Sequence, residues 1–415
     1  KSKSGALSAE GSYNESHEEA SQAVVSNMLS GGKLKIKTGG DASFEGANLG
    51  AKGDTELDAK GKIDFAAARD TAKSSSLDVA ANLGGSMAKE GASGSGAKRA
   101  GPSSDASGSF GVGVGKSSSE SSTATGGSIT SGGKLKITSG SDARFEGTDI
   151  SATGDASVAA KGNLTFDAAR STHKENSVDV SAGASGRKAS GLASRSTEEQ
   201  GTAFGRDGRG TQNGTRTEAA GNLGVGVGKK ESSTAVAGAI RSGGNLSLSS
   251  GGNTTLEGTQ VAAAGKAAIN AGGKVEFKAA ESTSSNLGVD VGVGGSMLRT
   301  TGAANAALPG SNPGLGTVAK KGIQAIRKTQ PTPAPAPGAT PAPRSVKEVS
   351  GHIGVDVGSS HTSQAGSIAA GQGIQINAGQ DMTLVGTQLN SGAGSTALTA
   401  GGNIDLQAAK SSSKS

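Results

Sequence analysis

Apolar and polar residues alternate in short runs along much of the chain. Leu34 and Ile36 are separated by a single lysine, and the run Ile63–Phe65 repeats the pattern around an aspartate. A period of two places successive side chains on opposite faces of a β-strand, so these runs predict strands with one buried and one exposed face. Glycine pairs such as the one at 31–32 separate the runs. We expect tight corners there, with backbone φ values that only glycine adopts at low cost.

The apolar positions recur after one fixed interval. Ile36 is followed 21 residues later by Leu57, and the same interval returns at 137/158, 145/166, 248/269 and 256/277. Short strands with glycine corners in coils of this length predict an all-β fold: a right-handed parallel β-helix (β-solenoid) whose coils stack at roughly 4.8 Å. The residues expected inside, with their counterparts in later coils, are Leu34, Ile36, Phe44, Leu57, Ile63 and Phe65.

A longer repeat divides the chain. Four related cassettes occupy residues 28–72, 129–172, 240–283 and 368–415. The segments between them, 73–128, 173–239 and 284–367, each contain two arms of alternating residues, such as SLDV at 76–79 and FGVGVGK at 110–116. Such arms predict long β-hairpin-like excursions that stand off the solenoid. Residues 1–27 are interpreted as the end of a preceding excursion, and both ends of the chain as cuts through a longer array.

The third excursion contains two further predicted features. Apolar residues within 315–329 recur at near-helical spacing, which predicts a short helix. Residues 331–344, PTPAPAPGATPAPR, are rich in proline and predict an extended polyproline loop.

Composition supports a repeat rather than a thick globular core. The chain has 415 residues, of which 71 are glycine, with one tyrosine, no tryptophan and no cysteine. Stacked coils need few large side chains, because their stability is a sum of contacts between neighbours. The absence of cysteine excludes disulfides and cysteine-ligated metals. The net charge is only +6, and the aromatic residues on which nucleic acids stack are scarce, so we expect no nucleic-acid partner.

Several motifs resemble chemical sites without meeting their requirements. GVGVGK at 111–116 and 224–229 lacks the glycine spacing of phosphate-binding and dinucleotide-binding loops. Acidic residues such as Asp54, Glu56 and Asp58 alternate along a predicted strand and differ between cassettes, unlike the clustered acids of polysaccharide-cleaving β-helices. The histidines lack the spacing of a metal-binding helix; they are His17, His173, His352 and His361. We therefore predict a chain that is not an enzyme, with no catalytic, cofactor-binding or metal-binding residues.

The cassettes resemble the haemagglutinin repeats of filamentous haemagglutinin and of the contact-dependent growth inhibition exoproteins. The resemblance is carried by SGGKLKIKTGGDASFEGANLGAKGDTELDAKGKIDFAAARDT and its three relatives, and above all by an E-G turn followed by an A-A-x-[ST] exit. The turn stands at Glu45-Gly46, Glu146-Gly147 and Glu257-Gly258, whereas the fourth cassette has Val385-Gly386.

The resemblance implies two-partner secretion through a dedicated outer-membrane transporter, and a secreted location at the bacterial cell surface. It implies no cofactor. Two roles are implied for such a shaft: delivery of a toxin across the outer membrane of a neighbouring bacterium, or support of an adhesin that binds host cells or glycans. Toxin delivery is the preferred expectation. The expected partner is the outer membrane of a target cell for toxin delivery, or a host-cell surface for adhesion.

Overall fold

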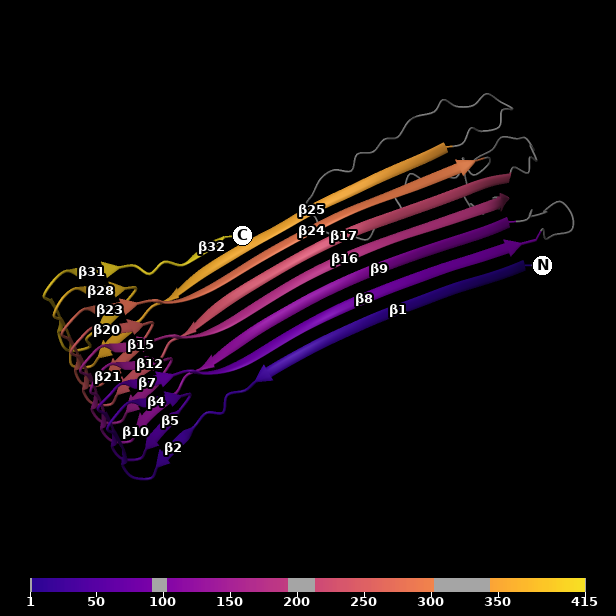
Figure 1. The fold of residues 1–415 in the computed structure, drawn as a ribbon. Helices are drawn as coiled ribbons and strands as arrows, with labels where there is room; N and C mark the ends of the chain where they lie inside the picture. The colour runs from indigo at the N-terminus through magenta and orange to yellow at the C-terminus, as the bar shows by residue number, and fades with distance from the viewer. Residues whose placement is uncertain (1, 92–102, 193–212, 302–343, 415) are drawn as a thin grey trace, which may run out of the picture.

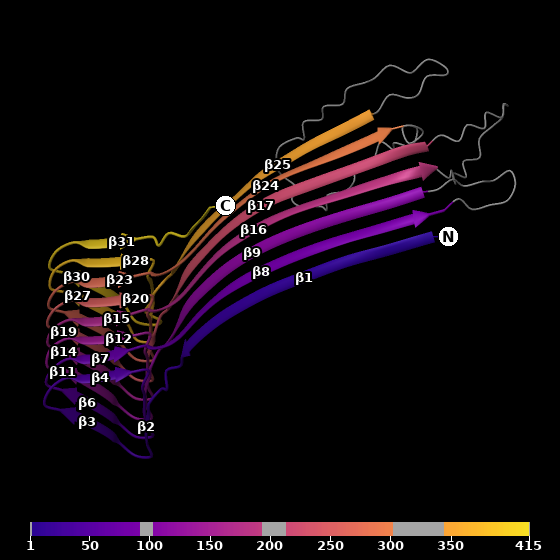
Figure 2. The same cartoon turned by 45° about the vertical axis from the view of Figure 1, so that its right-hand side comes forward.

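The computed structural model describes residues 2–91, 103–192, 213–301 and 344–414. Within these ranges the chain is all-β, with three parallel sheets that form a solenoid and one antiparallel sheet of long strands. The solenoid and the long strands are seen side by side in Figures 1 and 2, where the long strands run away from the solenoid. The predicted helix at 315–329 and most of the proline-rich segment lie outside the described residues.

Each turn of the solenoid contributes one strand to each of three eight-stranded parallel sheets. The first sheet contains β2 (Asn27–Ser30), β5 (Asn48–Ala51), β10 (Ser128–Ser131), β13 (Asp149–Ala152), β18 (Ala239–Ser242), β21 (Gln260–Ala263), β26 (Ser367–Ala370) and β29 (Gln388–Asn390). The second contains β3 (Leu34–Thr38), β6 (Thr55–Ala59), β11 (Leu135–Ser139), β14 (Ala156–Ala160), β19 (Leu246–Ser250), β22 (Ala267–Ala271), β27 (Ile374–Ala378) and β30 (Thr396–Ala400). The third contains β4 (Ala42–Glu45), β7 (Ile63–Ala66), β12 (Ala143–Glu146), β15 (Leu164–Asp167), β20 (Thr254–Glu257), β23 (Val275–Lys278), β28 (Met382–Val385) and β31 (Ile404–Gln407).

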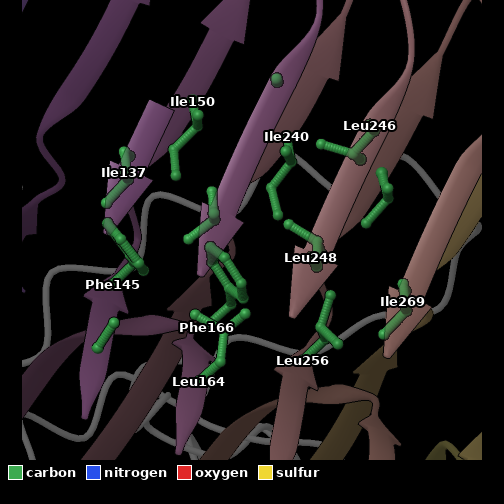
Figure 3. Packing of buried hydrophobic residues seen from close by; sticks show 14 of the residues in the cluster. Ile137, Phe145, Ile150, Leu164, Phe166, Ile240, Leu246, Leu248, Leu256 and Ile269 are labelled. Atoms are coloured by element: carbon green, nitrogen blue, oxygen red, sulfur yellow. The ribbon is translucent and has the colours of Figure 1, made fainter. Parts of the chain in front are cut away.

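The predicted 21-residue register is confirmed. Ile36 pairs with Leu57, and Phe44 pairs with Phe65 with ring centroids 4.4 Å apart. The stacking continues across the first excursion, because Phe65 also pairs with Phe145 although 80 residues separate them. Figure 3 shows the same interior further along the solenoid, where aliphatic and phenylalanine side chains form ladders.

Burial of the predicted interior residues depends on whether coils lie on both sides of them. Leu57, Ile63 and Phe65 are fully buried, whereas Ile36 and Phe44 in the first coil are only partly buried. The last coil behaves in the same way, since Leu406 is 67% exposed. The interior side chains of one coil are therefore fully buried only when a coil stacks on each side, as expected for a stack of repeats.

The corner glycines have a different cause from the one that the sequence suggested. Gly31, Gly32 and their counterparts do not adopt positive φ. Instead, at eight corners beyond the first coil, an aspartate or asparagine oxygen of the preceding coil accepts a backbone N–H, over 2.7 to 3.0 Å. A Cβ on Gly133 would lie 2.3 Å from the carboxylate oxygen of Asp54, so this close approach requires glycine.

These corner carboxylates are electrostatically stabilised. At Asp155 the backbone N–H of Asn245 and then the ammonium of Lys134 hold the pKa below its usual value. Asn163 and Asn253 occupy equivalent corners and accept the same backbone hydrogen bond. The contact therefore needs a side-chain oxygen in this position, and a carboxylate and an amide both provide one.

The excursions form the predicted hairpins, but the hairpins are longer and are joined to one another. They make one eight-stranded antiparallel sheet in the order β1-β8-β9-β16-β17-β24-β25-β32, which we call the hairpin sheet. Its strands are β1 (Ser2–Ser21), β8 (Ala68–Glu90), β9 (Ser103–Thr125), β16 (Ala169–Leu192), β17 (Asn213–Val236), β24 (Ala280–Thr301), β25 (Arg344–Gln364) and β32 (Ser412–Lys414).

The spacing of the solenoid explains why successive hairpins meet. The chain makes two coils between one hairpin and the next, and two coils advance the solenoid by about 9.6 Å. A hairpin of two strands is equally wide. Each hairpin therefore emerges beside the previous one, and β9 pairs with β16 and β17 with β24 across the boundary.

Candidate interaction surface

Each hairpin leaves the solenoid where two recurring parts of the cassette, the E-G turn and the A-A exit, touch. Gly147 of the E-G turn has φ 55°, and a Cβ there would lie 2.8 Å from the Cβ of Ala169, the first residue of β16. Gly46 and Gly258 have the same relation to Ala68 and Ala280. The turn and the A-A exit thus form one junction, which needs glycine for its positive φ and alanine for the close contact.

An arginine at the base of the hairpin ties it to the next cassette. Arg170 donates one hydrogen bond to Oε1 of Glu257, at 2.5 Å, and a second to the backbone oxygen of Glu281, at 2.6 Å. Arg69 makes the equivalent ion pair with Glu146 at 2.7 Å, where the glutamate is almost buried.

The third junction explains why the fourth cassette departs from the E-G pattern. Glu281 occupies the position of Arg69 and Arg170 in the third hairpin, and Val385 occupies the position of the glutamate in the following cassette. A glutamate at 385 would have faced another acid in place of the arginine. The arginine and its acidic partner are therefore lost together.

The hairpin sheet has one apolar face. Directly opposed residues of an antiparallel sheet point to the same side, so the strand registers define rows across all seven long strands. The central row contains Tyr13, Val79, Val114, Val180, Val225, Val291 and Ile353. The neighbouring rows on this face are also rich in Val, Leu, Phe and Met, and we call this region the apolar band.

The opposite face of the sheet is polar. The row offset by one residue contains Asn14, Asp78, Gly115, Asp179, Gly226, Asp290 and Gly354. The hairpin sheet is therefore amphipathic, with its polar face made largely of Asp, Gly and Ser.

The apolar band is open to solvent. Val225 is 37% exposed, Val114 40%, Phe110 51% and Ile353 60%, so no described element covers them. Seven strands at about 4.8 Å and a length of about ten residues give an area of roughly 1,000 Å². The largest apolar patch on a typical monomer is only about 300–600 Å², and larger patches mark contacts with proteins or membranes.

The motifs that resembled chemical sites lie in this sheet or on the solenoid surface. Both GVGVGK segments are inside long strands, β9 and β17, with their valines in the apolar band. Glu56 is bound by Lys35 at 2.9 Å, and that lysine holds the pKa of Glu56 below its usual value. On the polar face, His352 contacts Asp290 at 2.6 Å.

The part of the chain that the structure describes offers neither a metal site nor a membrane-spanning helix. It contains no cluster of three or more histidine and acidic side chains placed to hold a metal ion. Nor does it include a helix long and apolar enough to cross a membrane.

Comparison with known proteins identifies the repeat. The model of the hemagglutinin repeat family matches residues 7–109, 108–293, 226–314 and 354–415. The chain belongs to the hemagglutinin repeat family. This confirms the resemblance drawn from the cassettes, and the family match extends through most of the hairpins as well.

Two relatives of this hemagglutinin repeat chain are proteins named hemolysin. The one from Proteus mirabilis is 27% identical over 303 residues, and the one from Serratia marcescens is 28% identical over 305 residues. These matches cover 71% and 70% of this chain but only 17% of each hemolysin, so the chain spans about a sixth of their length. No solved structure matches the chain significantly.

Proposed function

We propose that this chain is a non-catalytic segment of a large secreted exoprotein, and that its hairpin sheet contacts the lipid surface of another cell. The observation that carries this proposal is the uncovered apolar band. The solenoid acts as the rigid support that sets the hairpins side by side. In this role the chain supports delivery of a toxin to neighbouring bacteria in contact-dependent growth inhibition.

Three further features support a surface contact of this kind. The side chains of the apolar band are mostly aliphatic, which favours lipid over the glycans that an adhesin would bind through aromatic stacking. The exposed aromatics among the described residues are few, with Tyr13 and Phe110 the main ones. The hemolysin name of the two relatives fits proteins that act on other cells. Export through a dedicated two-partner secretion transporter in the outer membrane is part of the same proposal.

The first test is a deletion in the parent exoprotein. Removing residues 28–411 should leave export and surface display intact and should leave attachment to target cells unchanged, while inhibition of targets is lost. Display is measured with antibody on whole cells, attachment by counting mixed aggregates, and inhibition by competition in mixed culture. Inhibition that survives the deletion would contradict delivery, and joint loss of attachment and inhibition would favour the adhesin role.

A finer test changes only the apolar band. The triple variant Val180→Ser, Val225→Ser and Val291→Ser removes three apolar side chains from the band and leaves the backbone hydrogen bonds intact. It should reduce target inhibition at least tenfold. The matched control changes three residues of the polar face instead, with Asp78→Ser, Asp179→Ser and Asp290→Ser. Equal loss in both variants would show that general damage to the sheet, rather than loss of apolar surface, is responsible.

A further inference from the structure

Beyond the apolar band, at the end of the hairpins away from the solenoid, the same face of the sheet becomes basic. On that face, Met87 stands in one row with Lys188 and Arg299. Lys347 is opposite Met297, and Lys3 is opposite Lys89, two residues beyond Met87. All five cations are exposed. We call Lys3, Lys89, Lys188, Arg299 and Lys347 the basic strip.

Among the described residues, the basic strip has no compensating negative charge on its own face. From the row of Tyr13 outward, no described residue on this face is acidic. None of the five cations makes an ion pair within the described part of the chain. Lys3 and Lys89 even stand directly opposite each other, an arrangement of like charges that is unfavourable in a sheet. The strip therefore attracts an anion.

Elsewhere in the same sheet, charges are balanced. Near the solenoid, Glu19, Lys73, Glu120, Lys174 and Glu231 alternate in sign across one row, and Lys73 pairs with Glu120 at 3.3 Å. At the far end, the acids lie on the polar face, and two of them, Asp105 and Glu218, pair with arginines there. Arg187 donates to Asp105 at 3.0 Å and holds the pKa of that carboxyl below its usual value. At the far end of the apolar face, by contrast, the described cations have no acidic neighbour on their own face.

We infer that the basic strip binds the phosphate groups of anionic lipids while the apolar band lies on the adjoining surface of the same bilayer. This inference rests on the proposed function and adds the class of lipid to it. An apolar surface bordered by lysine and arginine is the pattern of protein elements that lie in the plane of a membrane interface. Basic side chains near such a surface are attracted by anionic headgroups.

A second copy of this chain fits the face less well. If two copies packed face to face in parallel, the two basic strips would repel each other. In an antiparallel arrangement, each strip would meet the row near the solenoid, where the acids already have lysine partners, as Glu120 has Lys73. That row has no excess of negative charge to offer.

Vesicle binding by the 415-residue chain tests this inference. Vesicles of phosphatidylcholine alone are compared with vesicles containing about a third phosphatidylglycerol, and bound protein is measured by flotation. The wild-type chain should prefer the anionic vesicles. Each neutralised cation should weaken that binding about fivefold, so the triple variant Lys188→Gln, Arg299→Gln and Lys347→Gln should lose about a hundredfold.

The control variant removes the same charge from the same face near the solenoid, with Lys73→Gln, Lys174→Gln and Lys229→Gln. It should bind anionic vesicles within a few-fold of wild type, and circular dichroism should show both variants folded. Equal losses in the two variants would overturn the basic strip as a site, because net charge alone would then explain the binding.

The other outcomes separate this inference from the proposed function. Equal binding to both kinds of vesicle, lost in the valine-to-serine variant, would refute the basic strip and leave lipid contact standing. Binding to neither kind would refute both. If light scattering then showed a dimer that the valine-to-serine variant abolishes, the apolar band would be an interface between copies of the chain.

Discussion

Replacing Phe145 with alanine tests the solenoid interior where its geometry is best defined. The ring is 1% exposed and stacks between Phe65 and Phe166, with centroid distances of 5.4 and 5.0 Å. Deleting a buried phenylalanine side chain costs about 3–5 kcal/mol. The upper part of that range applies here, because backbone hydrogen bonds hold β12 against β7 and β15 and prevent the coils from closing the cavity. Two aromatic contacts are lost as well.

The loss should be measured by urea unfolding followed by circular dichroism, with hydrogen exchange and mass spectrometry to locate it. Exchange should increase first in β12 and its neighbours. Phe110→Ala is the matched control, since this ring is 51% exposed on the hairpin sheet and its removal should cost less than about 2 kcal/mol. If the two substitutions destabilise the chain equally, the stacked interior does not dominate stability and the solenoid account is wrong.

Three further predictions follow from the corners and junctions. Arg170→Ala should lower the free energy of unfolding by about 1 kcal/mol and increase hydrogen exchange at the start of β24, because a half-exposed ion pair to the next cassette is lost. Gly133→Ala should cost about 1–3 kcal/mol in a thermal melt, whereas Gly31→Ala, which has open space around it, should be nearly neutral. The lowered pKa of Asp155 gives stability that is complete above its unfolded pKa of 3.8 and is lost as the pH falls through the lower folded value. Urea unfolding from about pH 5 down to about pH 2 should show this loss, and Asp155→Asn, which keeps the oxygen acceptor, should reduce it.

Much of the solenoid could be predicted because its determinants are local. Alternation within a run such as 34–38 indicates a strand, and the 21-residue interval fixes which strands stack. Glycine at the corners was predicted correctly as a feature but for the wrong reason. The close approach of an aspartate from the preceding coil, as between Gly133 and Asp54, involves residues 79 positions apart and cannot be read from one corner alone.

The hairpin sheet was only partly predictable, because pairing between hairpins depends on the rise of the solenoid rather than on the residues of any one hairpin. The sequence nevertheless contains a signal for it. Val79, Val180 and Val291 each lie eleven residues after the first alanine of their strand, at 68, 169 and 280. An equal distance from the base places these valines in one row, although the number of residues between the two strands of a hairpin differs from one hairpin to the next. The basic strip has no such marker, since its cations come from different positions in each hairpin.

The matched widths of a hairpin and of two coils restrict how this protein can change in length during evolution. A duplication or loss that carries two coils together with one hairpin preserves the pairing between neighbouring hairpins. A change of one coil would shift the next hairpin by one strand and leave unpaired N–H and C=O groups along more than twenty residues. Copy number should therefore change in whole units, and each unit would widen the apolar band by the same amount. In the proposed role at a lipid surface, the strength of contact would scale with the number of units, as the avidity of a multivalent ligand depends on the number of its modules.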